Sequence, residues 1–143
     1  MSNTQDPANR FDLGRVSALF DTLGFSYKTD DKGFIYTQVK NVVLTYASLG
    51  DHGELLSILA KPAKEIPAVD RPTLVEFCNF SNREMIFPKS YVIDDDGTLS
   101  VRTAIAHLVA PDMPEDQLQA VVRMSIETNL RFFQALEGVS AQG

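Results

Sequence analysis

The residues best suited to bind an ion lie in an acidic turn, Asp94-Asp95-Asp96-Gly97. Neighbouring carboxylates supply the oxygen ligands that a hard cation such as Ca²⁺ prefers. A calcium-binding EF-hand loop, however, spaces its acids at alternate positions and ends on a glutamate. Here the acids are adjacent, and a strand pattern begins directly at Thr98. We therefore interpret the segment as a solvated hairpin turn in which Gly97 takes the positive φ.

The other groups that could perform catalysis are isolated along the chain. His52 and His107 are the two histidines, and Cys78 is the single cysteine. No H-x-x-x-H, H-E-x-x-H or C-x-x-C spacing occurs, and phosphate-binding glycine loops and the G-x-S-x-G elbow are absent. We interpret the histidines as surface or hydrogen-bonded residues and Cys78 as a small buried hydrophobe. The sequence predicts a protein that is not an enzyme and has no metal or cofactor.

Residues suited to recognition lie in the segment Asn79-Phe80-Ser81-Asn82-Arg83. Two amides and a hydroxyl at a helix end satisfy the helix's own unpaired carbonyls or bind the backbone of a partner. The first interpretation is a C-terminal helix cap, because such residues compete for backbone groups and favour helix ends. The second makes Asn79 and Asn82 partner-binding residues.

A third recognition candidate is Phe132 in the segment Arg131-Phe132-Phe133. Leu130 and Phe133 already belong to the apolar stripe of the expected last helix, so Phe132 points away from that stripe. Such an additional apolar side chain either widens the buried face of the helix or meets another subunit in a homodimer. The sequence leaves both uses open.

Three helices and six strands are expected to position these residues. Apolar residues repeat at helical spacing over 13–23 and 115–138, each segment closing at a glycine, and Asp70 with Pro72 marks the start of a helix ending near Arg83. Alternation and β-branched residues predict strands over 25–28, 34–36, 42–46, 55–60, 86–93 and 99–105.

The element order α-β-β-β-β-α-β-β-α predicts an α+β fold. Short turns join neighbouring strands, so the sheet should be antiparallel, with helices packed on one face. The chain has 143 residues, of which 44% are hydrophobic, which fits one domain with its own core. We expect a flexible tail over 1–10, a single domain over 11–138 and a frayed terminus over 139–143.

Composition and charge exclude several classes of partner. Thirteen basic and nineteen acidic residues give a net charge of −6, which disfavours binding to nucleic acid and to anionic lipid. No apolar run approaches the ~20 residues that span a bilayer. The first residues have neither a basic nor an apolar signal-peptide region, and one cysteine forms no internal disulfide. We expect a soluble protein of the reducing cytoplasm.

Several motifs, in their order along the chain, resemble those of the YbjN family, which is described as bacterial sensory-transduction regulators. The resemblance covers 13–136 and rests on Asn79-Phe80-Ser81-Asn82, Tyr91, the turn at 94–97, Leu99, Arg102, Pro114-Glu115 and Phe132-Phe133. It implies a fold like that of type III secretion chaperones, an antiparallel sheet flanked by helices. Those chaperones commonly form dimers and bind extended segments of partner proteins.

Two functions remain from these observations. The first is a non-enzymatic protein-interaction module, chaperone-like or regulatory, for which Phe132, Asn79 and Asn82 are the candidate contact residues. The second is a small-molecule or ion-binding sensor that uses the acidic turn or a pocket between the sheet and the helices. The absence of catalytic motifs, together with strand edges and apolar helix faces suited to recognition, favours the first.

Overall fold

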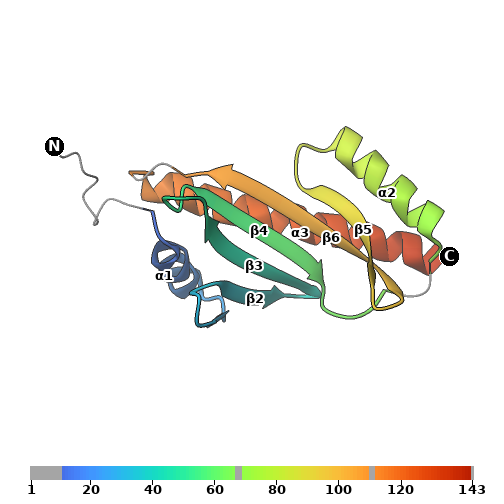
Figure 1. Ribbon diagram of the computed structural model, residues 1–143, viewed down its shortest axis with the longest axis horizontal. Helices are drawn as coiled ribbons and strands as arrows, with labels where there is room; N and C mark the ends of the chain where they lie inside the picture. The colour runs from blue at the N-terminus through green and yellow to red at the C-terminus, as the bar shows by residue number, and fades with distance from the viewer. Residues whose placement is uncertain (1–10, 67–68, 110–111, 143) are drawn as a thin grey trace.

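The computed structural model describes residues 11–66, 69–109 and 112–142, so the tail predicted over 1–10 lies outside the described residues. Figure 1 shows three helices and a twisted sheet. The elements are α1 (Leu13–Leu23), β1 (Lys28–Thr29), β2 (Ile35–Val39), β3 (Val42–Leu49), β4 (Leu55–Pro62), α2 (Arg71–Glu84), β5 (Lys89–Asp95), β6 (Thr98–Leu108) and α3 (Glu115–Gln142). This order confirms the predicted one.

The strands form one antiparallel sheet in the order β1-β2-β3-β4-β6-β5, which confirms the predicted fold class. The first strand is shorter than expected and pairs only Lys28 and Thr29 with β2. The reason is that Phe25 and Tyr27 pack around Phe20, with ring centroids 5.9 and 5.8 Å away, rather than extending the ladder. An aromatic cluster therefore replaces most of this strand.

The core lies between one face of the sheet and the helices. In Figure 1, α3 runs the length of the sheet behind it, while α2 lies alongside β5. Side chains from α3 such as Leu118 and Val122 are fully buried, as are Leu44 and Ile58 of the sheet. Phe20 of α1 fills the end of this core that lies beside α1. In the described part of the chain, no helix is long and apolar enough to cross a membrane.

A chain of buried polar groups fixes α3 over the sheet. The Tyr46 hydroxyl lies 2.8 Å from Ser125 Oγ, and Asn129 Nδ2 donates to the Ser125 carbonyl at 2.7 Å. Thr103 on β6 donates to Asn129 Oδ1. All four side chains are inaccessible to solvent, and burial raises the pKa of the Tyr46 phenol. Because buried polar groups are costly when unpaired, these bonds select one position of the helix.

The last helix is longer than the sequence predicts. It continues past Gly138 to Gln142, so Gly138 does not end it. A methyl group added at Gly138 would meet no atom within 4 Å. Glycine weakens a helix by only about 1 kcal/mol relative to alanine. One glycine in a helix of 28 residues is therefore tolerated without a break.

Candidate functional site

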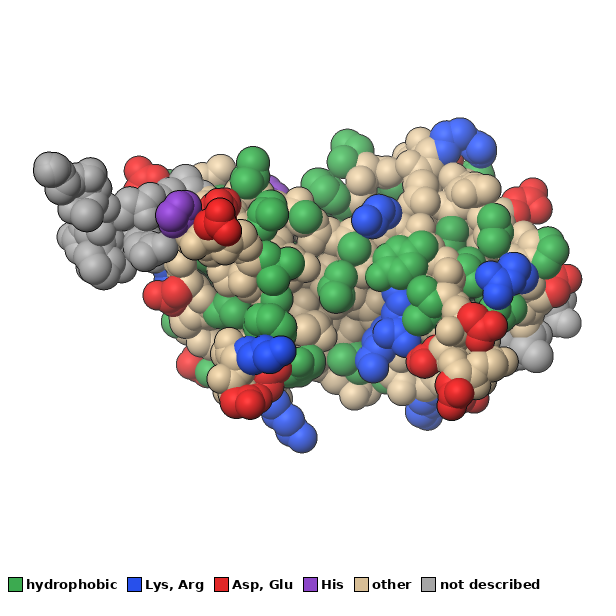
Figure 2. Space-filling model, in the orientation of Figure 1, with side chains coloured by type: hydrophobic (Ala, Val, Ile, Leu, Met, Phe, Trp, Pro, Cys, Tyr) green, Lys and Arg blue, Asp and Glu red, His purple; other side chains and the backbone are tan. Residues whose placement is uncertain are grey.

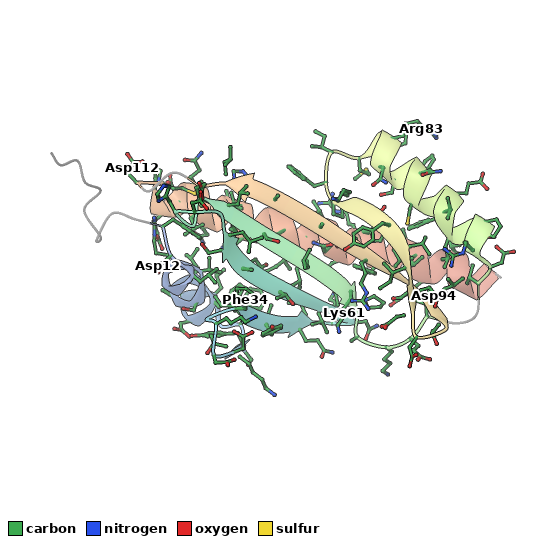
Figure 3. All side chains as sticks on the ribbon, in the orientation of Figure 1. Asp12, Phe34, Lys61, Arg83, Asp94 and Asp112 are labelled. Carbon is green, nitrogen blue, oxygen red and sulfur yellow. The ribbon has the colours of Figure 1, made fainter. Side chains whose placement is uncertain are left out.

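The acidic turn is built as a hairpin. Asp94 Oδ1 accepts a hydrogen bond from the Gly97 backbone at 2.9 Å, and Asp95 Oδ2 accepts one from Arg102 Nη2 at 3.1 Å. Asp96 and Gly97 have φ values of 55° and 87°. Two of the three carboxylates therefore already have partners, and the labelled Asp94 lies at the exposed end of the β5–β6 hairpin in Figure 3. The geometry supports the turn interpretation over a cation site.

The catalytic candidates do not form a site. Among residues 11–66, 69–109 and 112–142, no group of three or more His, Cys, Asp or Glu side chains is placed to hold a metal. Cys78 is buried, and burial raises the pKa of its thiol, which keeps it protonated rather than nucleophilic. His52 is exposed in the β3–β4 turn, and His107 Nδ1 lies 2.9 Å from the Leu108 carbonyl.

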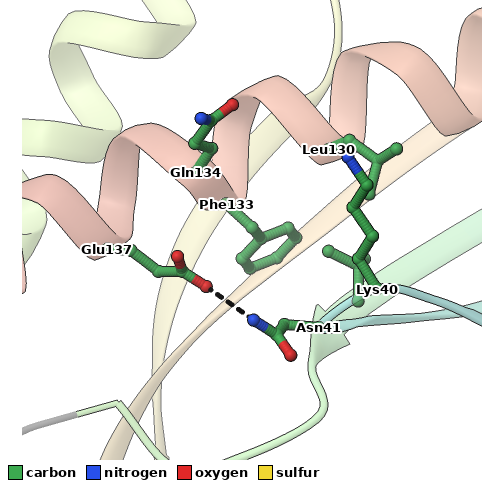
Figure 4. A pocket seen from close by; sticks show the side chains of 7 residues that line it. Lys40, Asn41, Leu130, Phe133, Gln134 and Glu137 are labelled. Carbon is green, nitrogen blue, oxygen red and sulfur yellow. Dashed lines mark hydrogen bonds between the residues drawn. The ribbon is translucent and has the colours of Figure 1, made fainter.

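One hollow lies where the β2–β3 turn meets α3 (Figure 4). Its volume is about 180 Å³, and its walls include Lys40, Leu130 and Phe133. Asn41 Nδ2 donates to Glu137 Oε1 across it at 3.3 Å. Lys40 has a φ of 54°, which the two-residue hairpin turn requires. The amide–carboxylate bond ties the hairpin to the helix, so we assign this hollow a structural role.

Asn82 also has a structural role, which corrects the helix-cap interpretation. Its Nδ2 donates to the Ser90 carbonyl at 3.1 Å, while its Oδ1 accepts from the Ser90 backbone N–H at 2.9 Å. The amide thus pairs with the edge of β5 as a neighbouring strand would. It does not cap its own helix, whose C-cap is Met85, and because the residue is exposed its partner-binding role stays a prediction. Asn79 lies exposed on α2, and its partner-binding role stays a prediction.

The position of Phe132 decides between the two uses that the sequence left open. Its side chain is 6% exposed, because α2 folds over it. The ring centroid lies 5.2 Å from that of Phe77 on α2 and 5.0 Å from that of Phe133. Phe132 therefore widens the buried face of α3 and joins it to α2. Its edge also lines an adjoining surface hollow, and its partner-binding role stays a prediction.

That second depression, which we call the α2–α3 hollow, is the strongest candidate for a functional site. Its volume is about 180 Å³, and its lining is almost entirely apolar. Phe77, Phe87 and Phe132 line it together with Phe80, and Arg131 contributes the main charged group. An engineered apolar cavity of about 150 Å³ holds a benzene molecule. The hollow therefore has the size and chemistry to receive one aromatic or large aliphatic side chain.

Exposed apolar side chains surround the α2–α3 hollow. Phe80 is 56% exposed and Met85 is 45% exposed, and both line it. Ile86, the next residue in the chain, is 90% exposed. The Arg83 guanidinium lies 5.5 Å from the centroid of the Phe80 ring, and Figure 3 labels Arg83 at this end of α2. Large apolar side chains grouped at a concave surface mark binding sites for proteins or ligands.

The sequence interpretation missed this rim because it assigned Ile86 and Phe87 to a strand. The strand begins at Lys89, three residues later. The signal available was the run Met85-Ile86-Phe87, whose consecutive apolar residues break the alternation of a half-buried strand. Pro88 after the run also disfavours ladder pairing there. The sequence does not indicate how α2 docks on α3. This docking brings Phe132 beside the run.

The comparisons with known proteins agree with the architecture. The family profile for YbjN, described as a "putative bacterial sensory transduction regulator", matches residues 12–138. The crystal structure of YbjN from E. coli, titled "a putative transcription regulator", superposes with a TM-score of 0.67 and 15% sequence identity, covering 92% of this chain and 90% of that chain. No curated protein matches in sequence. The structural likeness at this identity concerns the fold, whereas the profile spans most of the sequence, and the chain belongs to the YbjN family.

Proposed function

We propose that this protein is a non-enzymatic interaction module, regulatory or chaperone-like, that binds a partner protein at the α2–α3 hollow. The observation that carries the proposal is the apolar concavity lined by the exposed side chains of Phe80 and Met85, next to which Ile86 follows in the chain with 90% of its side chain exposed. The description of the family as sensory transduction regulators supports a regulatory role. A lone buried cysteine is compatible with action in the reducing cytoplasm.

The energetics favour a partner protein that inserts one large apolar side chain into the α2–α3 hollow. Burying one large apolar side chain contributes about 1.5–3 kcal/mol, and anchors of this kind in small pockets dominate many interfaces. Met85 adds a flexible thioether, which adapts to partners of different shape. A partner segment that inserts one Phe or Leu between α2 and α3 would cover Phe80 and Ile86 as well.

The sensor alternative has less support. Small-molecule sites usually enclose about 300–1,000 Å³, whereas the hollow measures about 180 Å³. Two carboxylates of the acidic turn already accept hydrogen bonds from the chain itself. A cation at the acidic turn would therefore have to displace existing contacts, whereas a protein side chain in the hollow would not.

Affinity capture with matched variants tests the proposal. Phe80→Ser and Ile86→Ser remove exposed apolar surface, and Val75→Ser makes a comparable change elsewhere on α2, where the side chain is also exposed. We expect the partner recovered with the wild-type chain to bind the first two variants at least ~10-fold more weakly, in line with the loss of one apolar anchor. Equal affinity of all four proteins would contradict the proposal.

Phe132→Asp is unsuitable for this test. The substitution would place a carboxylate between α2 and α3, where the ring is 6% exposed. An unpaired buried charge is costly enough to unfold a marginally stable domain. Loss of binding in that variant would therefore report folding as much as recognition.

A further inference from the structure

The methionines of this protein differ sharply in their access to solvent. Three of the four lie among the described residues, and the fourth is Met1. Met113 is 6% exposed and belongs to the core, and Met124 is half-buried against it. Met85, in contrast, is 45% exposed. Because an oxidant must reach the sulfur to react with it, Met85 is the described methionine that is most open to oxidation.

The single cysteine does not compete for the same oxidant. The Cys78 side chain is 3% exposed, and burial raises the pKa of its thiol. Peroxides react with a thiolate much faster than with a thiol, so a buried and protonated cysteine is inert towards them. Among the described residues, we therefore expect oxidation at Met85 rather than at Cys78.

Met85 lies at the rim of the α2–α3 hollow. It follows Glu84, the last residue of α2, and lines the hollow together with Phe80 and Phe87. Figure 2 shows hydrophobic side chains at the surface where α2 ends and the chain turns towards β5. Of the side chains that line the hollow, that of Met85 alone contains sulfur. It is therefore the one lining residue whose polarity a reversible oxidation changes.

We propose that Met85 is a reversible oxidation site, and that its conversion to the sulfoxide by a peroxide weakens partner binding at the α2–α3 hollow. The effect on binding rests on the proposed function, whereas the oxidation itself does not. The thioether sulfur attacks one peroxide oxygen, an S–O bond forms as the O–O bond breaks, and hydrogen peroxide leaves as water. Sulfur loses two electrons and the peroxide gains them, and methionine sulfoxide reductases reverse the change.

The sulfoxide should weaken binding because of what a partner would cover. Its oxygen is a strong hydrogen-bond acceptor, which water hydrates while the hollow is free, since Met85 is 45% exposed. A partner side chain would remove this water, and the almost entirely apolar lining offers little to replace it. A polar group buried without a hydrogen bond is unfavourable, so we expect an affinity about 10-fold lower. The free protein should stay folded.

Peptide mapping by mass spectrometry tests the site of oxidation. The full chain is treated with increasing amounts of hydrogen peroxide, and the added oxygen is followed at each methionine. We expect Met85 to be oxidised well before Met113 and Met124, which serve as internal controls, while far-UV circular dichroism stays unchanged. Oxidation of Met85 no faster than that of Met113 would overturn the proposal. This measurement needs no partner.

A small probe tests the effect on the hollow. N-acetylphenylalaninamide carries the single aromatic side chain that the hollow should accept, and the amide resonance of Ile86 reports its binding by NMR. We expect the oxidised chain to bind this probe about 10-fold more weakly than the reduced chain. Methionine sulfoxide reductase should restore the affinity. Equal affinity of the two forms would overturn the proposal.

Met85→Leu provides the matched control. Leucine keeps an apolar side chain of similar size but cannot be oxidised, so this variant should bind the probe equally before and after peroxide treatment. An equal loss of affinity in the variant would assign the effect to another residue and overturn the proposal. Probe binding to neither form of the wild-type chain would contradict the proposed function itself, an outcome distinct from equal binding to both forms.

Discussion

The two faces of the sheet use the same strands in different ways. Ile58 and Leu59 are adjacent in β4, yet Ile58 is fully buried against α3 while Leu59 is 45% exposed. Alternation sends successive side chains to opposite faces, so one strand supplies both the core and a free surface. The helices therefore stabilise this fold from one side of the sheet and leave side chains on the other side exposed.

Polar residues differ between the faces as well. On the covered face, Tyr46, Ser125 and Asn129 form a buried hydrogen-bonded chain with Thr103. On the face turned away from α3, Arg102 pairs with Asp95 at 3.1 Å, and the Asp95 side chain is 62% exposed while that of Arg102 is 25% exposed. A buried network is expensive to break, whereas an exposed ion pair contributes little. Mutations on the two faces should therefore differ in how much they lower the free energy of unfolding.

The largest difference is expected for the neighbours in β4. Ile58→Ala should lower the free energy of unfolding by about 2–5 kcal/mol, because it leaves a cavity in the core. Leu59→Ala should change it by less than about 0.5 kcal/mol, because this side chain is 45% exposed and leaves no cavity in the core. Urea denaturation of both variants measures the contrast. Similar losses of unfolding free energy for the two variants would show that the sheet face that carries Leu59 is covered.

The buried polar chain gives the next effect. Asn129→Ala should lower the free energy of unfolding by about 1–3 kcal/mol, because the Thr103 hydroxyl loses its acceptor inside the core. Asp95→Ala should cost less than about 1 kcal/mol, the range of exposed ion pairs. Denaturation curves of the two variants measure the difference. An Asn129 variant as stable as the Asp95 variant would show that the buried polar chain contributes no more to stability than the ion pair.

The smallest effect is pH-dependent and comes from Tyr46. Burial raises the pKa of its phenol in the folded protein above the ordinary value of 10.0, so the unfolded chain loses the proton first. The contribution of Tyr46 is therefore complete below pH 10 and declines at higher pH. It should fall by about 1.4 kcal/mol by pH 11.

Tyr46→Phe isolates this effect. The difference in unfolding free energy between the wild-type chain and the variant should shift by that amount between pH 8 and pH 11, because the other tyrosines titrate equally in both proteins. A constant difference across this range would mean that water reaches the hydroxyl in the folded state.

Much of the fold follows from the sequence alone. Hydrophobic periodicity and turn residues predict every helix and strand in the right order, because each element is amphipathic against one core. Boundaries are less predictable where tertiary packing overrides the local pattern. Phe25 and Tyr27 leave the first strand to pack on Phe20, and α3 runs through Gly138 because one glycine weakens a long helix only slightly.

The candidate site was only partly predictable. The sequence identified Phe132 as an unusual apolar residue, but its partner, Phe77, comes from a helix more than 50 residues earlier. Asn82 was recognised as a hydrogen-bonding group, yet its target on β5 depends on how α2 docks. The rim residue Ile86 had no distinguishing chemistry in the sequence. Tertiary contact, rather than a motif, creates the α2–α3 hollow.

Photocrosslinking in the living host tests whether a partner protein binds at the α2–α3 hollow. A photoreactive phenylalanine analogue replaces Ile86, and the same analogue replaces Val75 as the control. We expect a discrete crosslinked product with another polypeptide from position 86 and none from position 75, since position 86 lies between Met85 and Phe87, which line the hollow, whereas Val75 does not line it. Absence of a product at position 86, or an equal product at position 75, would contradict it.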